Sequence, residues 1–559
     1  MTNQWWKQAV VYQIYPKSFM DSDGDGFGDI NGIISKLDYL ADLGVDVLWL
    51  TPVYPSPEKD NGYDISDYYS INPHYGNLEQ FTELLKQVHA RGMKLIMDIV
   101  VNHTSTEHEW FKQASSSVDN PYHDFYIWKD GIGDTPPTNW ISKFGGSAWQ
   151  YCAAVSKYYL HLFDVTQADL NWENELVRQE VYKMMRYWLE LGVDGFRLDV
   201  INLISKSQDF VNDSLVSATA DGRKFYTDGP RIHEFLHEMN KQVFATREGL
   251  LTVGEMSSTT LDNCVIYTNP ANQELDMVFN FHHLKVDYPN GEKWAIAPFD
   301  FIQLKKLFNQ WQCGMQEGNG WNALFWSNHD QPRALSRFGD PIHYPFESAS
   351  MLATAIQLMQ GTPYIYQGKE LGMTNPEFDE LAQYRDVESH NAAHILTSQG
   401  LSPNQVMTIL QAKSRDNART PMQWDNTPNA GFSSVTPWIE VAKNYPRLNA
   451  RQIVANPDSI YHHYRKLSKL RKDYPVIVAG KYKQLFNDDK QLYVYSRTRD
   501  GEVLLVINNF YDQSLNFTLP AEFKAYSQQK ILLNNYPHKI DSLASFELMP
   551  YQSLVILFN

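Results

Sequence analysis

Eight short apolar segments constrain the fold of this 559-residue chain more than any other feature. Four of them follow a helix-like segment that stops at glycine: KLDYLADLG precedes VDVLWLTPVY, FTELLKQVHARG precedes MKLIMDIVVNH, VYKMMRYWLELG precedes VDGFRLDVIN, and SMLATAIQLMQG precedes TPYIYQGKE. Glycine suits the left-handed residue that ends a helix. The other four segments are VVYQIYPKSF, LLTVGEM, MVFNFHH and NALFWSNHD. Segments that are apolar on both faces are typical of buried parallel strands.

Eight strand-and-helix units in succession predict an α/β fold, a (β/α)₈ TIM barrel whose active site lies at the carboxyl ends of its strands. About 70 residues between the third and fourth units are rich in aromatics, Gly and Asn and lack helical periodicity. After about residue 480 the pattern alternates, and Asp500-Gly501 reads as a hairpin turn. The expected parts are the barrel in two pieces, an inserted subdomain after strand 3, and a C-terminal antiparallel β-domain, at residues 1–103 and 174–480, 104–173, and 481–559 respectively.

Composition narrows the class of partner. The formal net charge of −17 argues against nonspecific nucleic-acid binding, which needs a basic surface. Fifteen Trp and 33 Tyr supply rings that stack on flat apolar ligand faces, such as those of sugars or bases. Three scattered cysteines indicate neither a disulfide framework nor a zinc site. With no signal-like N-terminus and no long apolar run, we expect a cytoplasmic protein with a small-molecule ligand, no membrane or nucleic-acid partner and no organic cofactor.

Carboxylates follow three of the predicted strands. Asp199 ends the fourth, Glu255 the fifth and Asp330 the seventh. Any one of them alone is more simply explained as a solvated loop acid, but three strand ends of one barrel converge. Paired carboxylates in a sugar-sized pocket suit glycosidic-bond cleavage, in which one attacks the anomeric carbon and the other protonates the leaving oxygen. Arg197 lies two residues before Asp199, on the same face of the strand, and can hold that nucleophile ionised.

Two histidines also stand at strand ends, each next to an asparagine. They are His103 and His329. A lone histidine is more often structural, yet ring nitrogens at these positions would be useful donors to sugar hydroxyls. We expect both histidines to line the pocket.

The segment DSDGDGFGDINGI, residues 21–33, sets acids at every second position around glycines, as the first half of an EF-hand loop does. An EF-hand needs a carboxylate at its twelfth position, which here is Gly32. A calcium switch is therefore a poor explanation, and a closed barrel offers no helix pair that could open. A fixed ion-binding loop and a plain polar turn both remain open.

Four separated motifs resemble, in order, the signature regions of the α-amylase family, glycoside hydrolase family thirteen. They are DIVVNHTS (98–105), GFRLDVIN (195–202), VGEM (253–256) and SNHDQPR (327–333); QADLNW (167–172) resembles a further family motif. The resemblance implies a retaining mechanism with Asp199 as nucleophile, Glu255 as acid/base and Asp330 as transition-state stabiliser. It also implies a site for the terminal glucose, formed by Asp60, Tyr63, His103, Arg197, His329 and Arg415.

Within the family, GYDISDYYSINPHYGN, RDNARTPMQW and GTPYIYQGKELGMTN resemble the exo-acting oligosaccharide hydrolases. Val200 after the nucleophile resembles members that do not prefer α-1,4 bonds, and Lys369 departs from the usual QGEE. The resemblance extends to the acidic loop, which in these relatives binds metal. It implies a structural Ca²⁺ held by Asp21, Asp23, Asp25, Asp29 and the carbonyl of Phe27, with water completing the shell.

The segments at 222–240, 253–264 and 279–294 are most similar to the trehalose-6-phosphate hydrolases of this group. The third segment brings a cluster of bases to the end of the sixth strand, where a phosphate on the leaving sugar would need them. The predicted phosphate ligands are Lys285, Lys293, His282 and His283, with Arg231 as a further candidate. Hydrolysis would yield glucose and glucose 6-phosphate. An oligo-1,6-glucosidase and, from another class, an inactive sugar-binding homologue are the alternatives.

Overall fold

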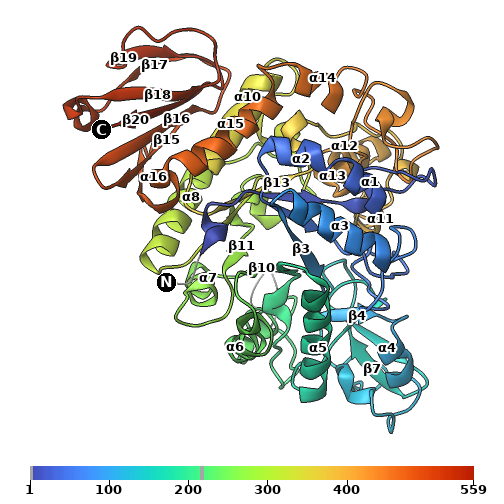
Figure 1. The fold of residues 1–559 in the computed structure, drawn as a ribbon. Coiled ribbons are helices and arrows are strands. Elements are labelled where there is room, and N and C mark those ends of the chain that lie inside the picture. The colour runs from blue at the N-terminus through green and yellow to red at the C-terminus, as the bar shows by residue number, and fades with distance from the viewer. Residues whose placement is uncertain (1–3, 215–219) are drawn as a thin grey trace.

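The computed structural model describes residues 4–214 and 220–559; residues 1–3 of the N-terminal stretch and residues 215–219 of the second barrel piece lie outside the described chain. The eight predicted segments form a parallel sheet in the order β11-β10-β9-β3-β2-β1-β13-β12. A parallel bridge between Val278 and Asn322 joins the two ends of that order and closes the barrel (Figure 1), so the predicted fold class is confirmed. The strands are β1 (Val11–Ile14), β2 (Val47–Leu50), β3 (Lys94–Ile99), β9 (Gly195–Leu198), β10 (Leu251–Glu255), β11 (Met277–Phe279), β12 (Ala323–Leu324) and β13 (Thr362–Tyr366).

Helices surround the barrel, each with its apolar face turned to the strands. In α3, Phe81, Leu84, Leu85 and Val88 are buried, which is the spacing of one helical face. Two of the four predicted glycine stops cap their helices with positive φ, Gly44 (φ 89°) after α2 and Gly192 (φ 112°) after α5. The other two glycines lie beyond the helix ends, because Arg91 caps α3 and Leu358 caps α10. The helices around the barrel are α1 (Ile30–Ser35), α2 (Leu37–Leu43), α3 (Leu78–Ala90), α5 (Glu175–Leu191), α6 (Ile232–Gln242), α7 (Leu261–Thr268), α8 (Phe301–Glu317), α9 (Ala334–Phe338), α10 (Pro345–Gln357), α14 (Ala450–Ala455), α15 (Ile460–Asp473) and α16 (Pro475–Ala479).

Subdomain B, the insertion after β3, projects from one side of the barrel, where Figure 1 labels β4, α4 and β7. Its strand β4 pairs antiparallel with β8, with His103 opposite Asp169, so the QADLNW segment returns beside the third strand. Its core is aromatic and includes Trp140 and Trp149. The elements are β4 (His103–Ser105), α4 (Glu109–Ala114), β5 (Trp128–Lys129), β6 (Trp149–Cys152), β7 (Lys157–Leu160) and β8 (Gln167–Asp169).

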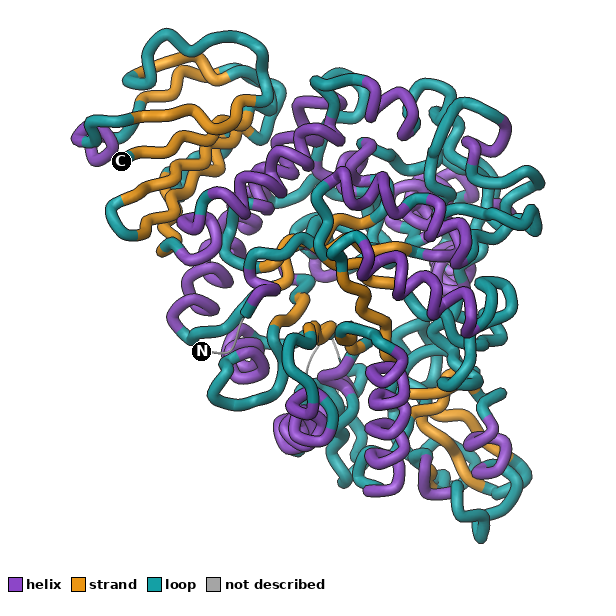
Figure 2. The backbone as a smooth tube through the Cα atoms, viewed as in Figure 1, coloured by secondary structure: helices purple, strands orange, loops and turns teal. Residues whose placement is uncertain are grey.

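The C-terminal residues form an antiparallel β-domain beside α8, α10 and α15, which Figure 2 shows as a separate group of strands. The predicted hairpin turn is present, since Asp500 and Gly501 both have positive φ between β15 and β16. Lys305 of α8 fixes the domain by donating hydrogen bonds to three of its carbonyl groups. The strands are β14 (Lys481–Leu485), β15 (Leu492–Arg499), β16 (Glu502–Asn509), β17 (Leu515–Thr518), β18 (Gln529–Asn534), β19 (Ser545–Leu548) and β20 (Ser553–Phe558).

A helical pair that the sequence analysis did not anticipate follows the eighth strand. Helices α11 (Val387–Ser398) and α12 (Pro403–Lys413) pack on one another, and the short α13 (Asp416–Arg419) follows. This pair brings Asp386 and Glu388 to the carboxyl ends of the barrel strands. Within residues 4–214 and 220–559, no helix is long and apolar enough to cross a membrane.

Candidate active site

A cavity of about 280 Å³ opens at the carboxyl ends of the strands, with walls from both the barrel and subdomain B. Two groups of residues line it. We call the first, Asp60, Asp199, Glu255, Asp330 and Arg415, the inner end, and the second, Lys143, Ser257, Lys285 and Tyr288, the outer end. Tyr63, His103 and Lys293 also line the cavity, as the sequence predicted.

One buried arginine organises the two predicted catalytic carboxylates. Arg197, which is 1% exposed, lies on β9 and donates from Nη1 to Asp199 Oδ1 at 2.6 Å, while its Nη2 lies 2.6 Å from Glu255 Oε2. Its Nη1 also bonds Asp98 Oδ1 at 2.7 Å. Burial raises the pKa of Asp199, and the positive charge of Arg197 opposes that rise. Because one guanidinium holds both carboxyl groups, Asp199 and Glu255 lie close together, as a retaining mechanism needs.

Asp98 is a part of this cluster that the sequence analysis missed. It accepts hydrogen bonds from Trp49 Nε1 at 3.2 Å and Tyr63 Oη at 3.0 Å as well as from Arg197. Burial raises its pKa to about 6 against the effect of Arg197. The residue stands inside the DIVVNHTS motif, so the signal was present, but nothing in the motif distinguished this acid from a strand residue.

The backbone is strained directly after the predicted nucleophile. Val200 has φ 35° and ψ 38°, a left-handed conformation that β-branched residues avoid. Its amide donates to Glu255 Oε2 at 3.2 Å. Strain of this kind persists where surrounding contacts enforce it, and it is concentrated at functional sites. Here it links the peptide after Asp199 to the neighbouring carboxylate of Glu255.

The third carboxylate, Asp330, faces several positive groups. Arg419 Nη2 donates to its Oδ1 at 2.8 Å and Arg415 Nη1 at 3.3 Å. Burial would raise the pKa of Asp330, but His329, Arg415 and Arg419 more than offset it and hold that pKa well below its usual value. The positive groups around Asp330 therefore favour its ionised form.

Arg415 links both sides of the inner end. It donates to Asp60 Oδ1 at 3.1 Å and to Asp386 Oδ1 at 2.5 Å, and it lies 3.2 Å from Glu388 Oε2. Burial raises the pKa of Asp60 to about 7, against the effect of Arg415. Asp386 and Glu388 were not predicted, because they come from the unanticipated α11 and have no strand-end signal.

Both predicted histidines are buried; His103 lines the cavity, but His329, contrary to expectation, does not. His103 Nε2 lies 3.1 Å from the carbonyl of Tyr63, and burial lowers its pKa to about 4. His329 stacks on Tyr63 with ring centres 5.1 Å apart, and burial lowers its pKa to about 3. Gln13 Nε2 lies 2.8 Å from His329 Nδ1 and fixes that ring. Neutral rings beside an aromatic face suit the uncharged hydroxyls of a sugar.

The predicted phosphate residues do not all reach the cavity. Lys285 lines the outer end and is exposed, and Lys293 lines the cavity wall but is bound to both oxygens of Glu388 at 2.6 and 2.7 Å. His282 and His283 lie in a 3₁₀ turn after β11 and pack under the rim, where His283 Nε2 contacts the carbonyl of Phe325 at 2.7 Å. Neither histidine lines the cavity.

Arg231, the further candidate, is also occupied elsewhere. At the start of α6 it bonds Glu234 Oε2 at 2.8 Å through Nε and forms an ion pair with Glu173. It does not line the cavity. Lys143 of subdomain B, which the sequence analysis did not predict, lines the outer end. It belongs to an irregular segment whose sequence carries no signal of function.

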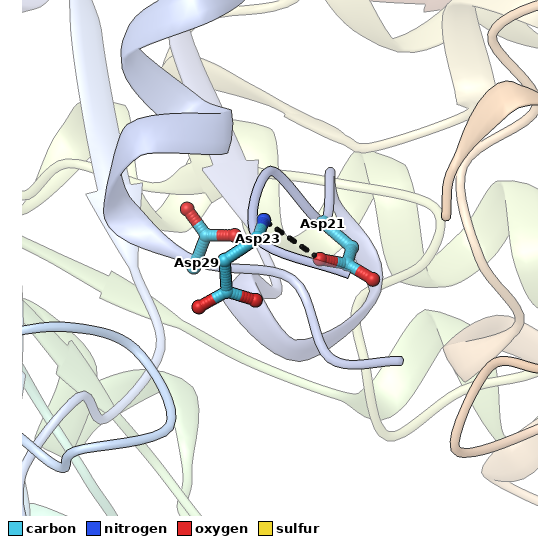
Figure 3. Close-up of side chains that lie close together, drawn as sticks. All are labelled: Asp21, Asp23 and Asp29. Atoms are coloured by element: carbon cyan, nitrogen blue, oxygen red, sulfur yellow. Dashed lines mark hydrogen bonds between the residues drawn. The ribbon is translucent and has the colours of Figure 1, made fainter. Parts of the chain in front are cut away.

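The acidic loop lies between β1 and α1, and Figure 3 shows Asp21, Asp23 and Asp29 close together. One carboxylate oxygen from each lies within 4.8 Å of the others. Asp29 also caps α1 through the amide of Gly32 at 2.8 Å. Asp25 is outside this group, and its Oδ1 accepts from the amide of Phe27 at 2.8 Å. Three clustered carboxylates fit the hard oxygen donors that Ca²⁺ prefers.

Comparisons with known proteins cover the whole chain. The alpha amylase catalytic-domain family matches residues 13–480, and the C-terminal domain of the alpha-amylase SusG matches residues 492–555. The chain is 59% identical over 557 residues, 99% of its length and 98% of the relative, to a trehalose-6-phosphate hydrolase of Bacillus subtilis (strain 168). It is 50% identical to an oligo-1,6-glucosidase of Parageobacillus thermoglucosidasius, with 99% of each chain covered.

Among solved structures, trehalose-6-phosphate hydrolase of Bacillus licheniformis superimposes with a TM-score of 0.95 at 59% identity, with all of both chains covered. A sucrose-bound isomaltulose synthase of Erwinia rhapontici NX5 gives the same TM-score of 0.95 at 39% identity. These structural matches extend over the full length of the chain. The chain belongs to the alpha-amylase family of glycoside hydrolases.

Proposed function

We propose that the protein is a retaining α-glucoside hydrolase that cleaves trehalose 6-phosphate into glucose and glucose 6-phosphate. The single observation that carries the choice of substrate is that one cavity joins an inner end whose charged groups are ion-paired to an outer end whose two lysines have no ion pair among the described residues. The relatives named trehalose-6-phosphate hydrolase, at 59% and 50% identity over nearly the full chain, support it.

In the first half of the reaction the terminal glucose would occupy the inner end. Asp60 and Arg415 would bind its hydroxyls, and Tyr63 would cover its apolar face. Asp199 attacks the anomeric carbon while Glu255 gives its proton to the leaving oxygen, which breaks the glycosidic bond and forms a covalent glucosyl ester. Asp330, held ionised by its arginines, would strengthen its contact with the sugar as positive charge develops.

In the second half, water enters on the face that the leaving sugar has vacated. Glu255, now a carboxylate, takes a proton from that water, which attacks the anomeric carbon and releases Asp199. Arg197 contacts both groups throughout, so it can stabilise whichever of them is negative at each step. The proton balance closes because Glu255 gives one proton and recovers one.

The leaving sugar is the part of the substrate that carries phosphate. A phosphate monoester carries between one and two negative charges near neutral pH, and its oxygens form strong charge-assisted bonds with ammonium groups. Lys285 has no ion pair with any described residue, so its charge is available to such a ligand.

An oligo-1,6-glucosidase acting on isomaltose-type sugars is the second candidate. Its supporting observation is the 50% identity to proteins of that name. An oligo-1,6-glucosidase would not need the charge of Lys285 at the outer end, because isomaltose carries no charge. An inactive sugar-binding homologue would not need Asp199, Glu255 and Asp330 arranged around two arginines.

The test is a comparison of kcat/KM for trehalose 6-phosphate, trehalose and isomaltose, followed by the same series for Lys285→Ala. We expect a strong preference for the phosphorylated sugar that falls about tenfold or more in the variant, the usual size of one hydrogen bond to a charged group. Lys306→Ala, an exposed lysine on α8, is the matched control. Equal turnover of isomaltose, or a preference untouched by Lys285→Ala, would refute the assignment.

We also propose that the acidic loop binds a structural Ca²⁺. Asp21, Asp23 and Asp29 would supply carboxylate oxygens, and the charge of the ion would relieve the repulsion that raises the pKa of Asp23 beyond the effect of burial. Asp25 and the carbonyl of Phe27 would join only after a small rearrangement of the loop. The ion would brace the loop that follows β1.

A cytoplasmic location is proposed on the cysteines. Cys152, Cys264 and Cys313 are all free thiols in the described chain, and Cys264 is buried. Secreted proteins of this kind would be expected to pair or lose such residues.

A further inference from the structure

A second lysine without an ion pair among the described residues lines the cavity together with Lys285. Lys143 belongs to subdomain B, whereas Lys285 follows β11 of the barrel, and both line the same cavity. Lys143 is partly buried and makes one side-chain hydrogen bond, to Ser257 Oγ at 3.3 Å. Neither lysine forms an ion pair with any residue of the described chain. The outer end of the cavity therefore has two lysine ammonium groups without an ion pair among the described residues.

These positive charges repel one another. After burial, the groups that lower the pKa of Lys143 are Arg223 and Lys285, while Asp221 and Asp169 act in the opposite sense. Arg223 is itself bound to Asp221 through three side-chain hydrogen bonds of 3.0, 2.7 and 2.5 Å. Like charges brought together in a partly buried site cost free energy unless an anion joins them. The four residues of the outer end include no carboxylate, so an anionic group on a ligand would be a suitable partner for both lysines.

Hydrogen bonds link Lys143 to the segment that follows Glu255. Ser257, to which it donates, stands two residues after Glu255, and the amide of Ser257 donates to Asn202 Oδ1 at 2.9 Å. Asn202 Nδ2 in turn donates to the carbonyl of Ser257 at 3.0 Å. The Lys143 ammonium is therefore held next to the segment that follows Glu255, the predicted proton donor to the leaving sugar. A charged substituent on that sugar would be within the part of the cavity that Lys143 and Lys285 line.

We propose that Lys143 is a phosphate-binding and specificity-determining residue, which with Lys285 clamps the 6-phosphate between subdomain B and the barrel. This inference rests on the proposed function and adds to it a residue from a different part of the fold. The ammonium groups of Lys143, from subdomain B, and Lys285, from the barrel, can each bond a different phosphate oxygen. Neutral disaccharides gain nothing from either group, so the clamp would set the preference for the phosphorylated substrate.

The experiment measures the ratio of kcat/KM for trehalose 6-phosphate to that for trehalose in Lys143→Met, Lys143→Arg and the control Lys157→Met. Lys157 lies in the same subdomain and pairs at the surface with Asp130 at 2.7 Å. We expect the ratio to fall about tenfold or more in Lys143→Met, to recover in part in Lys143→Arg, and to stay unchanged in the control. Inhibition by glucose 6-phosphate, assayed with 4-nitrophenyl α-glucoside as a neutral substrate, should weaken in parallel.

The outcomes separate the two proposals. If the parent protein shows no preference for trehalose 6-phosphate, the proposed function itself fails. A parent preference that Lys285→Ala lowers and Lys143→Met does not would reject the clamp and leave the function standing. Equal losses on both substrates in Lys143→Met, or on glucose 6-phosphate and glucose as inhibitors, would mean that the lysine only supports the local structure. Should Lys143→Met fold poorly, Lys143→Gln decides by the same ratio.

Discussion

The inner and outer ends of the cavity treat charge in opposite ways. At the inner end every charged group has a partner: Arg197 contacts Asp199 and Glu255 at 2.6 Å, and Arg415 contacts Asp60 at 3.1 Å. At the outer end Lys143 and Lys285 have no ion pair among the described residues. The two ends also differ in burial, since Asp60, Asp199, Glu255 and Arg415 are buried, whereas Lys143 is partly buried and Lys285 is exposed.

The difference indicates which chemical group each end of the cavity can bind. Ion-paired groups are held in place and present fixed hydrogen-bond donors and acceptors to a neutral ring, which is how a site positions a sugar before reaction. Unpaired cations favour an incoming anion and repel cations. The ends should therefore respond differently to mutation: the inner end governs all substrates alike, and the outer end distinguishes among them.

The largest expected effect is that of Asp199→Asn. Removing the nucleophile should lower kcat by roughly 10⁴-fold or more for phosphorylated and neutral substrates equally, since both pass through the same covalent intermediate. Turnover is measured with trehalose 6-phosphate and with 4-nitrophenyl α-glucoside, and circular dichroism checks that the fold persists. A modest loss, or one confined to a single substrate, would remove Asp199 from its role.

Asp386→Asn comes next and tests whether the inner end acts on all substrates alike. The carboxylate holds Arg415 by two bonds, at 2.5 and 3.1 Å, so its loss frees that arginine to shift away from Asp60. We expect kcat/KM to fall on the order of 100-fold for trehalose 6-phosphate and trehalose together, the size typical of a small misplacement of a binding group. A change in the ratio of kcat/KM between trehalose 6-phosphate and trehalose would contradict the proposed difference between the inner and outer ends.

The pH dependence should sharpen the same distinction. Burial, with Arg223 and Lys285, lowers the pKa of Lys143 to about 8, while Asp221 and Asp169 act in the opposite sense. A lysine is positive below its pKa, so the charge at this end is present below about pH 8 and is lost as the pH rises through that value. The phosphate itself loses charge below about pH 6.

The expected result is a preference for trehalose 6-phosphate over trehalose that is greatest between about pH 6 and pH 8 and falls several-fold above it. The ratio of kcat/KM for the two sugars, measured from pH 5.5 to 9.5, removes changes that are common to both. Lys143→Arg should carry the preference to higher pH, because an arginine stays charged. A ratio that is flat across this range would contradict the prediction.

Metal removal should have the smallest effect on catalysis. A chelator is expected to lower Tm by about 5 to 10 °C, as loss of a ligand bound well above its Kd does, while kcat at 25 °C changes less than about twofold. Asp23→Asn should lower Tm in the same way and abolish the response to chelator. Melting that does not change in excess chelator would return the acidic loop to a plain polar turn.

Sequence reasoning correctly placed residues in the cavity where they follow strand ends. Asp199, Glu255 and Asp330 each follow a recognisable apolar run, and a closed barrel brings such ends together whatever the loops do. It was less successful for residues set by short turns. His282 and His283 were expected beside the leaving sugar, but one 3₁₀ turn directs His283 to Phe325 instead.

Charge partners explain the other differences. Lys293 reaches the cavity but is bound by Glu388, and Arg231 is bound by Glu234, because acids distant in the chain or one helical turn away lie within reach. Conversely, Lys143 comes from an irregular insertion in which no periodicity points to a pocket. Which cations are free depends on which acids fold next to them, and residue types alone do not carry that information.

The sequence by itself determined the closed barrel, the two additional domains and the convergence of three carboxylates at the strand ends, because hydrophobic periodicity and glycine stops are local signals that add up along the chain. Only the tertiary structure decided the electrostatics of the cavity. Arg415 meets Asp60 across 355 positions of sequence, and Lys143 meets Ser257 across 114. Pairings at such separations are set by the packing of whole elements, so the balance between occupied and free charge appears only after the chain has folded.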